Sequence, residues 1–174
     1  MLDTMKQRGF TIVELVITIS IMLILLALTI TNLTSSQVNA RDLERSTKVA
    51  TIGNHMETFY KSGNNSSTTL GRYPSTALLA SGETSLKTFF PYIDMKTATA
   101  PGATSVASSF LAATNNIETV GGVSPQPTKS QFIYQPIQTS GALCTTESQE
   151  CRRYNIYYLT EVGNAVVKVM SKHQ

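Results

Sequence analysis

The sequence predicts an α+β fold in which one long N-terminal helix packs, through its second half, on a small antiparallel β-sheet. Three features indicate this class: a long uncharged apolar run near the N-terminus, a stripe of apolar residues at helical spacing after it, and three short segments rich in aromatic and β-branched residues near the C-terminus. With 174 residues, the chain has room for one modest soluble domain beside the apolar run.

The apolar run covers residues 15–33 and contains no charge, proline or glycine. As a helix it is roughly 28 Å long, close to the thickness of a bilayer's hydrocarbon core. Basic residues flank it on both sides, with Lys6 and Arg8 before it and Arg41 after it, so positive charge alone does not orient it. The run is longer than the apolar region of a cleaved secretory signal and does not end in small residues, which favours a membrane anchor.

Residues 1–9 (MLDTMKQRG) are polar and basic at their end, and we predict that they form a leader peptide rather than part of the fold. Residues 10–33 form the apolar part of the helix. Residues 34–62 continue the same helix as an amphipathic segment, because helix-forming residues follow one another without proline. Gly63-Asn64-Asn65 supplies the C-terminal stop, so that the helix has about fifty residues.

The second half of this helix carries an apolar stripe at Val49, Ile52, Met56 and Phe59, with Tyr60 beside it. Spacings of three and four residues place these side chains on one helix face. We predict that the stripe packs on one face of the sheet as ordinary core, and we assign no chemistry to it.

Residues 63–130 are rich in Ser, Thr, Ala, Gly and Pro, and we predict a loosely structured connecting αβ-loop region there. Short helices are expected near residues 76–80 and 86–92.

Residues 131–174 are predicted to form the antiparallel sheet and a loop closed by a disulfide. Pro136 fits best at an edge or at a strand end, because it cannot donate a ladder hydrogen bond. The expected strands are 131–137, 154–160 and 165–170, with a hairpin loop at 161–164.

Cys144 and Cys151 are the two cysteines of the chain, and six polar or charged residues separate them. In a chain with a membrane export feature, this spacing favours a disulfide. A pair of free thiols and half of a metal site are the alternatives, although no CxxC pattern and no nearby histidine supports a metal.

The balance of charge does not indicate a nucleic-acid-binding protein. Without residues 1–9, twelve basic and ten acidic side chains remain. Arg152-Arg153 is the one basic pair beyond the apolar run, and two solvated charges at a strand start explain it.

His55 and His173 are expected to be solvated and belong to no visible catalytic constellation. The sequence therefore predicts no enzymatic activity, no catalytic residue, no metal site and no cofactor, and nucleic acid as a partner is unsupported.

The segment from Arg8 through Leu15 (RGFTIVEL) resembles the processing motif of type IV pilins and pseudopilins: a basic leader, Gly9, Phe10, and Glu14 at the fifth mature position. The resemblance continues through the striped helix to Tyr73-Pro74. It departs from the family in one respect, because many pilins carry proline and often glycine in the apolar segment, whereas residues 15–33 have neither. Thr29, Thr31 and Asn32 are the weaker helix formers there.

The resemblance implies cleavage between Gly9 and Phe10 by a prepilin peptidase and N-methylation of the new Phe10 amine. It also implies that Glu14 pairs with the Phe10 amine of a neighbouring subunit and sets register in a helical homopolymer. The protein would be a single-pass precursor in the cytoplasmic membrane, served by an assembly platform and motor of the inner membrane, and then part of an extracellular surface filament. Without the family, an alternative interpretation is that Glu14 is a carboxylate at the membrane interface, near the positive end of the helix dipole.

Several functional alternatives stay open at the level of sequence. The chain fits a major pilin, but also a minor pilin or pseudopilin of a secretion or DNA-uptake machine. Adhesion and motility are further roles of such filaments. A different class is an uncleaved, membrane-anchored binding module. A third possibility is a signal-anchored exported enzyme, for which the sequence contains no supporting motif. Asn64 and Asn65 also match the N-glycosylation pattern.

Overall fold

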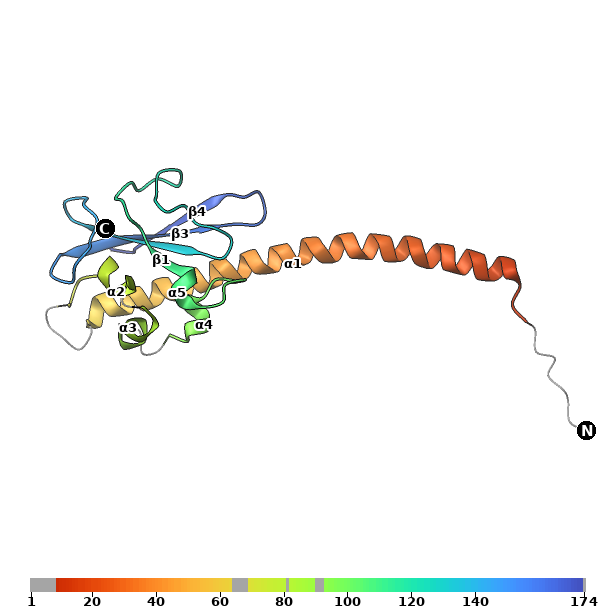
Figure 1. Ribbon diagram of the computed structural model, residues 1–174, viewed down its shortest axis with the longest axis horizontal. Coiled ribbons are helices and arrows are strands. Elements are labelled where there is room, and N and C mark those ends of the chain that lie inside the picture. The colour runs from red at the N-terminus through yellow and green to blue at the C-terminus, as the bar shows by residue number, and fades with distance from the viewer. Residues whose placement is uncertain (1–8, 64–68, 81, 90–92, 174) are drawn as a thin grey trace, which may run out of the picture. The chain divides into compact units, whose positions relative to one another are not determined.

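The computed structural model describes residues 9–63, 69–80, 82–89 and 93–173. Helix α1 runs over Ile12–Ser62 and has 51 residues, which confirms the prediction of one helix of about fifty (Figure 1). Gly63 ends it with a positive φ of 62°, and its N–H donates to the carbonyl of Phe59, as in a left-handed C-terminal cap. The chain divides into two compact units at residues 38 and 39, and the unit Asn39–Gln174 is called the head.

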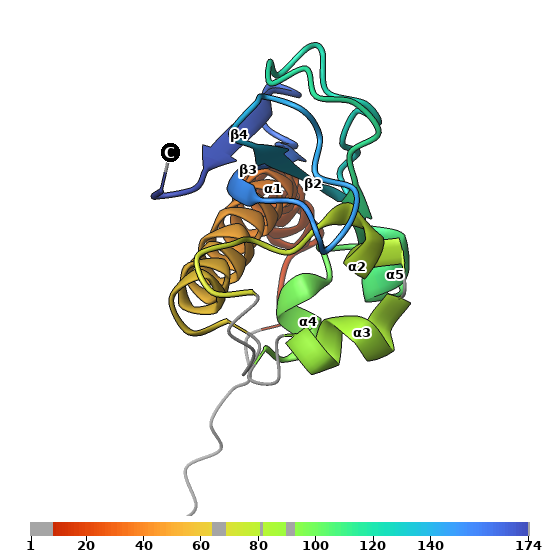
Figure 2. The same ribbon diagram turned by 90° about the vertical axis from the view of Figure 1, so that its left-hand side faces the viewer.

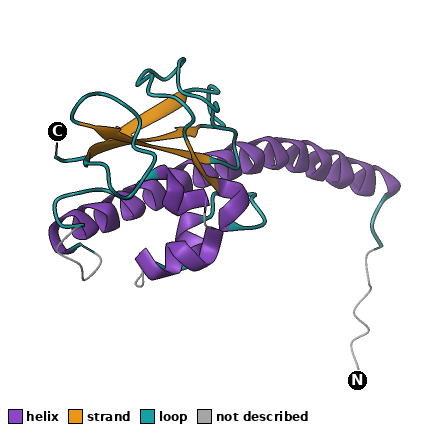
Figure 3. Ribbon diagram, turned by 60° about the vertical axis from the view of Figure 1, so that its left-hand side comes forward, coloured by secondary structure: helices purple, strands orange, loops and turns teal. Residues whose placement is uncertain are grey.

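The apolar stripe of α1 lies in the core of the head, as predicted. Val49, Ile52, Met56 and Phe59 are all buried and share one cluster with aromatic residues of the sheet. Figure 3 shows the strands as one layer with this part of α1 across one of its faces. The helix stripe and the sheet therefore bury each other, and the architecture is α+β.

Four short helices connect α1 to the sheet: α2 (Thr76–Ala80), α3 (Gly82–Phe89), α4 (Met95–Ala98) and α5 (Val106–Ser109). Seen along α1, they and the sheet lie on different sides of it (Figure 2). Asp94 caps α4 and Ser105 caps α5 through side-chain oxygens that accept backbone N–H groups. The expected helix at 76–80 is confirmed, and the second one begins earlier than expected, at Gly82. Residues 90–92 and the glycosylation pattern at Asn64 and Asn65 lie outside the described residues.

The sheet has four strands in the order β1-β2-β3-β4: β1 (Phe110–Ala112), β2 (Phe132–Gln138), β3 (Cys151–Leu159) and β4 (Val166–Met170). β2, β3 and β4 pair antiparallel, as predicted. β1, however, pairs with β2 in parallel, so the sheet is mixed: the three predicted strands are antiparallel, and β1 adds a parallel edge strand that was not predicted.

The extra strand comes from the region that was predicted to be loosely structured. Three residues carry too little alternation to be recognised as a strand, but Phe110 is buried against Tyr134 and the N–H of Ala113 donates to the Tyr134 carbonyl. Tertiary contact therefore outweighs the weak local preference of this segment.

Pro136 lies inside β2 and not at a strand end, but on one side it is at an edge, which was the other position that the sequence suggested. It is tolerated because β1 pairs only as far along β2 as Tyr134, so the missing N–H of Pro136 interrupts no ladder bond on that side. Its carbonyl instead accepts the N–H of Cys144 at 2.9 Å.

The second face of the sheet is also covered, although only one covered face was expected. Ala113 and Val123, from the loop after β1, pack with Ile133 and Tyr157 in a separate small core. The buried Gln135 amide donates to the carbonyls of Asn115 and Ile117 in the same loop. Because this buried polar group is satisfied, the loop is held to the sheet without a penalty for desolvation.

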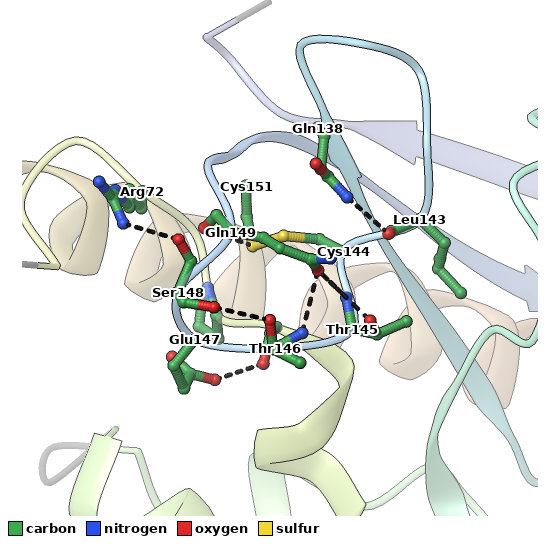
Figure 4. Close-up of a disulfide and its surroundings, with 12 residues drawn as sticks. Arg72, Gln138, Leu143, Cys144, Thr145, Thr146, Glu147, Ser148, Gln149 and Cys151 are labelled. Atoms are coloured by element: carbon green, nitrogen blue, oxygen red, sulfur yellow. Dashed lines mark hydrogen bonds between the residues drawn. A yellow bond between two sulfur atoms is a disulfide. The ribbon is translucent and has the colours of Figure 1, made fainter.

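A disulfide joins Cys144 and Cys151, with their Cα atoms 5.7 Å apart. Figure 4 shows the loop that it closes, in which the Gln149 side chain accepts the backbone N–H groups of Thr145 and Thr146. The loop also contacts the segment after α1, because Tyr73 N–H donates to the Cys151 carbonyl and Thr76 N–H to the Cys144 carbonyl. Cys151 is the first residue of β3, so the bridge fixes the start of a central strand.

Replacing Cys144 with serine should lower the melting temperature of the oxidised protein and leave the reduced protein almost unchanged. In the loop-entropy model a ring of this size contributes about 2.5 kcal/mol by limiting the unfolded chain. The measurement is thermal unfolding of the full chain in detergent micelles, with and without reductant. An equal loss under both conditions would mean that the serine disturbs packing and that the bridge contributes little.

Candidate functional site at the N-terminal end of α1

Residues Gly9, Phe10 and Thr11 precede the first helical residue, Ile12. Thr11 caps the helix: its Oγ1 accepts the N–H of Glu14 at 3.2 Å, and its carbonyl accepts the N–H of Leu15 at 3.2 Å. An N-cap threonine satisfies one of the N–H groups that the first turn leaves without an intrahelical partner. The predicted cleavage junction therefore lies in non-helical backbone.

Among the described residues, nothing covers the junction. Phe10 is 84% exposed, and a Cβ built on Gly9 would meet no atom within 4 Å. A glycine at this position leaves the backbone accessible to a partner that approaches it. Residues 1–8 of the predicted leader, including Lys6 and Arg8, lie outside the described residues.

Glu14 lies in the first turn of α1, where a negative charge is favoured by the helix dipole. Within the part of the chain that the structure describes, no hydrogen bond or ion pair engages its carboxylate. Its position leaves the carboxylate available to a group from another molecule.

The helix surface that follows Glu14 is apolar and exposed. In the described residues, α1 is the one helix long and apolar enough to cross a membrane, by length and composition. Its hydroxyls are internally bonded: Thr18 Oγ1 donates to the Leu15 carbonyl and Thr29 Oγ1 to the Leu25 carbonyl, both at 2.8 Å. Such bonds let a helix carry threonine in an apolar environment. The apolar helix thus suggests membrane anchoring of the precursor.

Within the head, α1 is tied to the β3–β4 loop by a cluster of four charged side chains. The Arg45 guanidinium, only 2% exposed, donates to Asp42 at 2.8 Å, to Glu161 at 2.6 Å and to the Lys129 carbonyl at 2.8 Å. Arg41 donates to both oxygens of Glu161 from an exposed position. Asp42 in turn accepts the N–H groups of Glu161 and Val162. Three segments of the head therefore converge on Arg45.

This cluster should make the stability of the head depend on pH in the acid range. Hydrogen bonds from Arg41 and Arg45 lower the pKa of Glu161 from 4.5 to about 2. The unfolded chain takes up a proton there at higher pH than the folded chain, so the free energy of unfolding falls as the pH decreases from about 4.5 to about 2. Melting curves of the full chain over this range should show a smaller loss for Glu161→Gln than for the wild type. Parallel curves for the two proteins would contradict this assignment.

A buried carboxylate on α1 holds the C-terminal segment. Glu57 accepts the Tyr73 hydroxyl at 3.0 Å and the N–H of Lys172 at 3.0 Å, and His173 Nε2 lies 3.4 Å from it. Burial, together with Glu57, raises the pKa of the Tyr73 hydroxyl, which therefore stays protonated and donates. His173 also stacks on Tyr60, with ring centroids 4.4 Å apart. It thus contacts the head through Glu57 and Tyr60, while its side chain remains 43% exposed, in keeping with the solvated position that the sequence suggested.

The arginine pair at the start of β3 is neutralised by nearby acids. Arg153 pairs with Glu118 at 2.8 Å, and Arg152 pairs with Glu150 at 3.2 Å and donates to the Gly71 carbonyl. The two side chains bind loops of this chain, so they do not form a free basic patch.

Sequence reasoning predicted roles for Gly9, Phe10 and Glu14, which stay predictions, and did not name Thr11. The signal was present, because Thr11-Ile12-Val13-Glu14 fits the pattern of a threonine N-cap followed three residues later by glutamate. It also missed Arg45: its pairing with Asp42 three residues earlier is local, but its burial depends on Lys129 and Glu161, which lie far away in the sequence.

Among protein-family models, the prokaryotic N-terminal methylation motif matches residues 4–30. The matched segment contains the junction at Gly9 and Phe10, the cap Thr11, the acid Glu14 and most of the exposed apolar helix. Neither the curated proteins nor the solved structures gave a match.

Proposed function

We propose, from the premise that this chain is a type IV pilin-like or pseudopilin-like prepilin, that it is the structural subunit of a type IV pilus or a related filament. The methylation motif points to a structural role rather than to an enzyme, and it implies processing by a prepilin peptidase and assembly in a membrane. In this proposal the peptidase cuts after Gly9, the Phe10 amine is methylated, and the mature subunits polymerise through α1 into a filament outside the cell.

One observation carries the proposal: α1 begins with an unpaired acid and continues with a surface that is apolar all round. The exposed apolar side chains are stable in lipid, but once withdrawn from it they must be buried against identical helices. Head-to-tail repetition of such contacts gives an open helical polymer. A carboxylate in an apolar environment is costly unless it is paired, which favours Glu14 as the partner of a neighbouring Phe10 amine.

Cleavage would link processing to assembly. Removal of residues 1–9 takes away the basic side chains Lys6 and Arg8 and creates the amine at Phe10. The precursor lacks this amine at the required place, so it could insert in the membrane without polymerising.

Mass spectrometry of the N-terminus in the native organism tests the proposal. The expected mature protein starts at an N-methylated Phe10 and is recovered in filaments sheared from the cell surface. A start at Met1 would contradict the proposal and support a membrane-anchored binding module. A processed protein at trace level in the filaments would assign it to a minor pilin or pseudopilin of the same machinery.

A further inference from the structure

The side chain of Thr11 separates the proposed cleavage junction from helix α1. Gly9, Phe10 and Thr11 are non-helical, whereas Ile12 is the first residue of a helix that continues without interruption to Ser62. Only Phe10 and Thr11 therefore stand between the Gly9–Phe10 peptide bond and the first residue of this long helix.

The hydrogen bonds at Thr11 set where the helix begins. Thr11 Oγ1 accepts the N–H of Glu14, and the Thr11 carbonyl accepts the first intrahelical N–H, that of Leu15. This is the arrangement of an N-cap, whose own backbone is not helical. In a membrane environment the cap matters more than in water, because an unsatisfied backbone N–H has no solvent partner.

Loss of the Thr11 hydroxyl would move the helix start toward the junction. Alanine is a poor N-cap and a good helix former, and phenylalanine is not a favoured cap either, whereas glycine is tolerated as one. With Thr11→Ala, the next usable cap upstream is Gly9, and the helix would then begin at Phe10. The Gly9–Phe10 bond would become part of the helix entry, where its backbone can no longer extend into a peptidase.

We propose that Thr11 is a positioning residue for processing: its side-chain cap stops α1 at Ile12 and so presents the Gly9–Phe10 bond to the peptidase as extended backbone. The proposal rests on the proposed cleavage after Gly9. Thr11 takes no part in the chemistry, and the reaction remains hydrolysis of one peptide bond by a partner enzyme.

The test is cleavage of the purified full-length precursor in detergent micelles by a prepilin peptidase, read as kcat/KM from the ratio of precursor to mature protein. Thr11→Ala should lower kcat/KM about fivefold, in line with the shift in population that loss of a cap produces. Thr11→Ser keeps the accepting oxygen and should be cleaved like the wild type. Thr18→Ala is the matched control, because the Thr18 hydroxyl bonds inside the helix and caps nothing.

Hydrogen exchange of the same micelle samples reports the helix start directly. The Val13 amide should exchange fast in the wild type and in Thr11→Ser, because the first intrahelical bond there is donated by Leu15. In Thr11→Ala the Val13 amide should become protected, because a helix capped at Gly9 gives it the Gly9 carbonyl as acceptor. The proposal would be overturned if Thr11→Ala were cleaved with the kcat/KM of the wild type. It would also be overturned if Thr11→Ser lost as much kcat/KM as Thr11→Ala. A wild-type precursor that is not cut after Gly9 would instead contradict the proposed function itself, so the two failures are distinguishable.

Discussion

Replacing Glu14 with leucine should abolish filament formation while membrane insertion and cleavage after Gly9 continue. The apolar helix is kept, so insertion is unaffected, and the cap at Thr11 uses the Glu14 backbone rather than its side chain. In the proposed filament, the lost element is the partner of the Phe10 amine in a neighbouring subunit. An unpaired amine buried in apolar surroundings is strongly unfavourable, and each 1.4 kcal/mol lost per contact weakens that contact about tenfold.

The measurement is the amount of sheared filament, with the mature and precursor forms quantified in membranes of the same cells. Thr18→Leu provides a control, because it also replaces a polar residue by leucine one turn further along the same helix face. It should assemble normally. Wild-type amounts of filament from Glu14→Leu would rule out the pairing role, and a failure of both variants would show that assembly merely senses any change on this face.

Replacing Arg45 with methionine should be the most destabilising single change in the charged cluster of the head. The guanidinium is almost fully buried and donates hydrogen bonds to two carboxylates and a backbone carbonyl. Removing one member of a buried ion pair leaves uncompensated charge, which typically costs about 3 to 5 kcal/mol. For a domain of this size we expect a fall in melting temperature of about 10 °C.

Arg41→Met is the matched control, because Arg41 contacts the same Glu161 from an exposed position and exposed pairs contribute little. The measurement is the melting temperature of both full-length variants in micelles, with thermal unfolding monitored by circular dichroism. Similar melting temperatures for the two variants would mean that the burial of Arg45 is not what makes the cluster important.

Much of the fold was predictable because it depends on patterns within single segments. The helical stripe from Val49 to Phe59 and the aromatic strands near the C-terminus each follow a period that is visible locally. The strand at Phe110 was not predictable, since three residues have no usable period, and its parallel pairing depends on a loop folded over the far face of the sheet. The parts that failed are those whose stability comes from residues distant in the sequence.

The candidate site divides in the same way. Roles for Gly9, Phe10 and Glu14 were predicted from a contiguous motif, and the cap at Thr11 was predictable from its spacing to Glu14. The buried roles of Arg45 and Glu57 were not, because each depends on partners that only the folded head brings within 3 Å. A charged residue on a helix is usually solvated, so the sequence alone argues against the roles that these two side chains have.

The amino-acid sequence by itself therefore determined the apolar helix and the order of helix and sheet, and it predicted the processing junction before the helix, because these follow from composition and short-range spacing. Only the tertiary structure decided that the sheet is mixed, that both of its faces are covered, and that buried Arg45 and Glu57 attach α1 to the β3–β4 loop and to the C-terminal segment. The physical reason is that burial and charge pairing are properties of surfaces that meet, and residues from distant segments make up those surfaces.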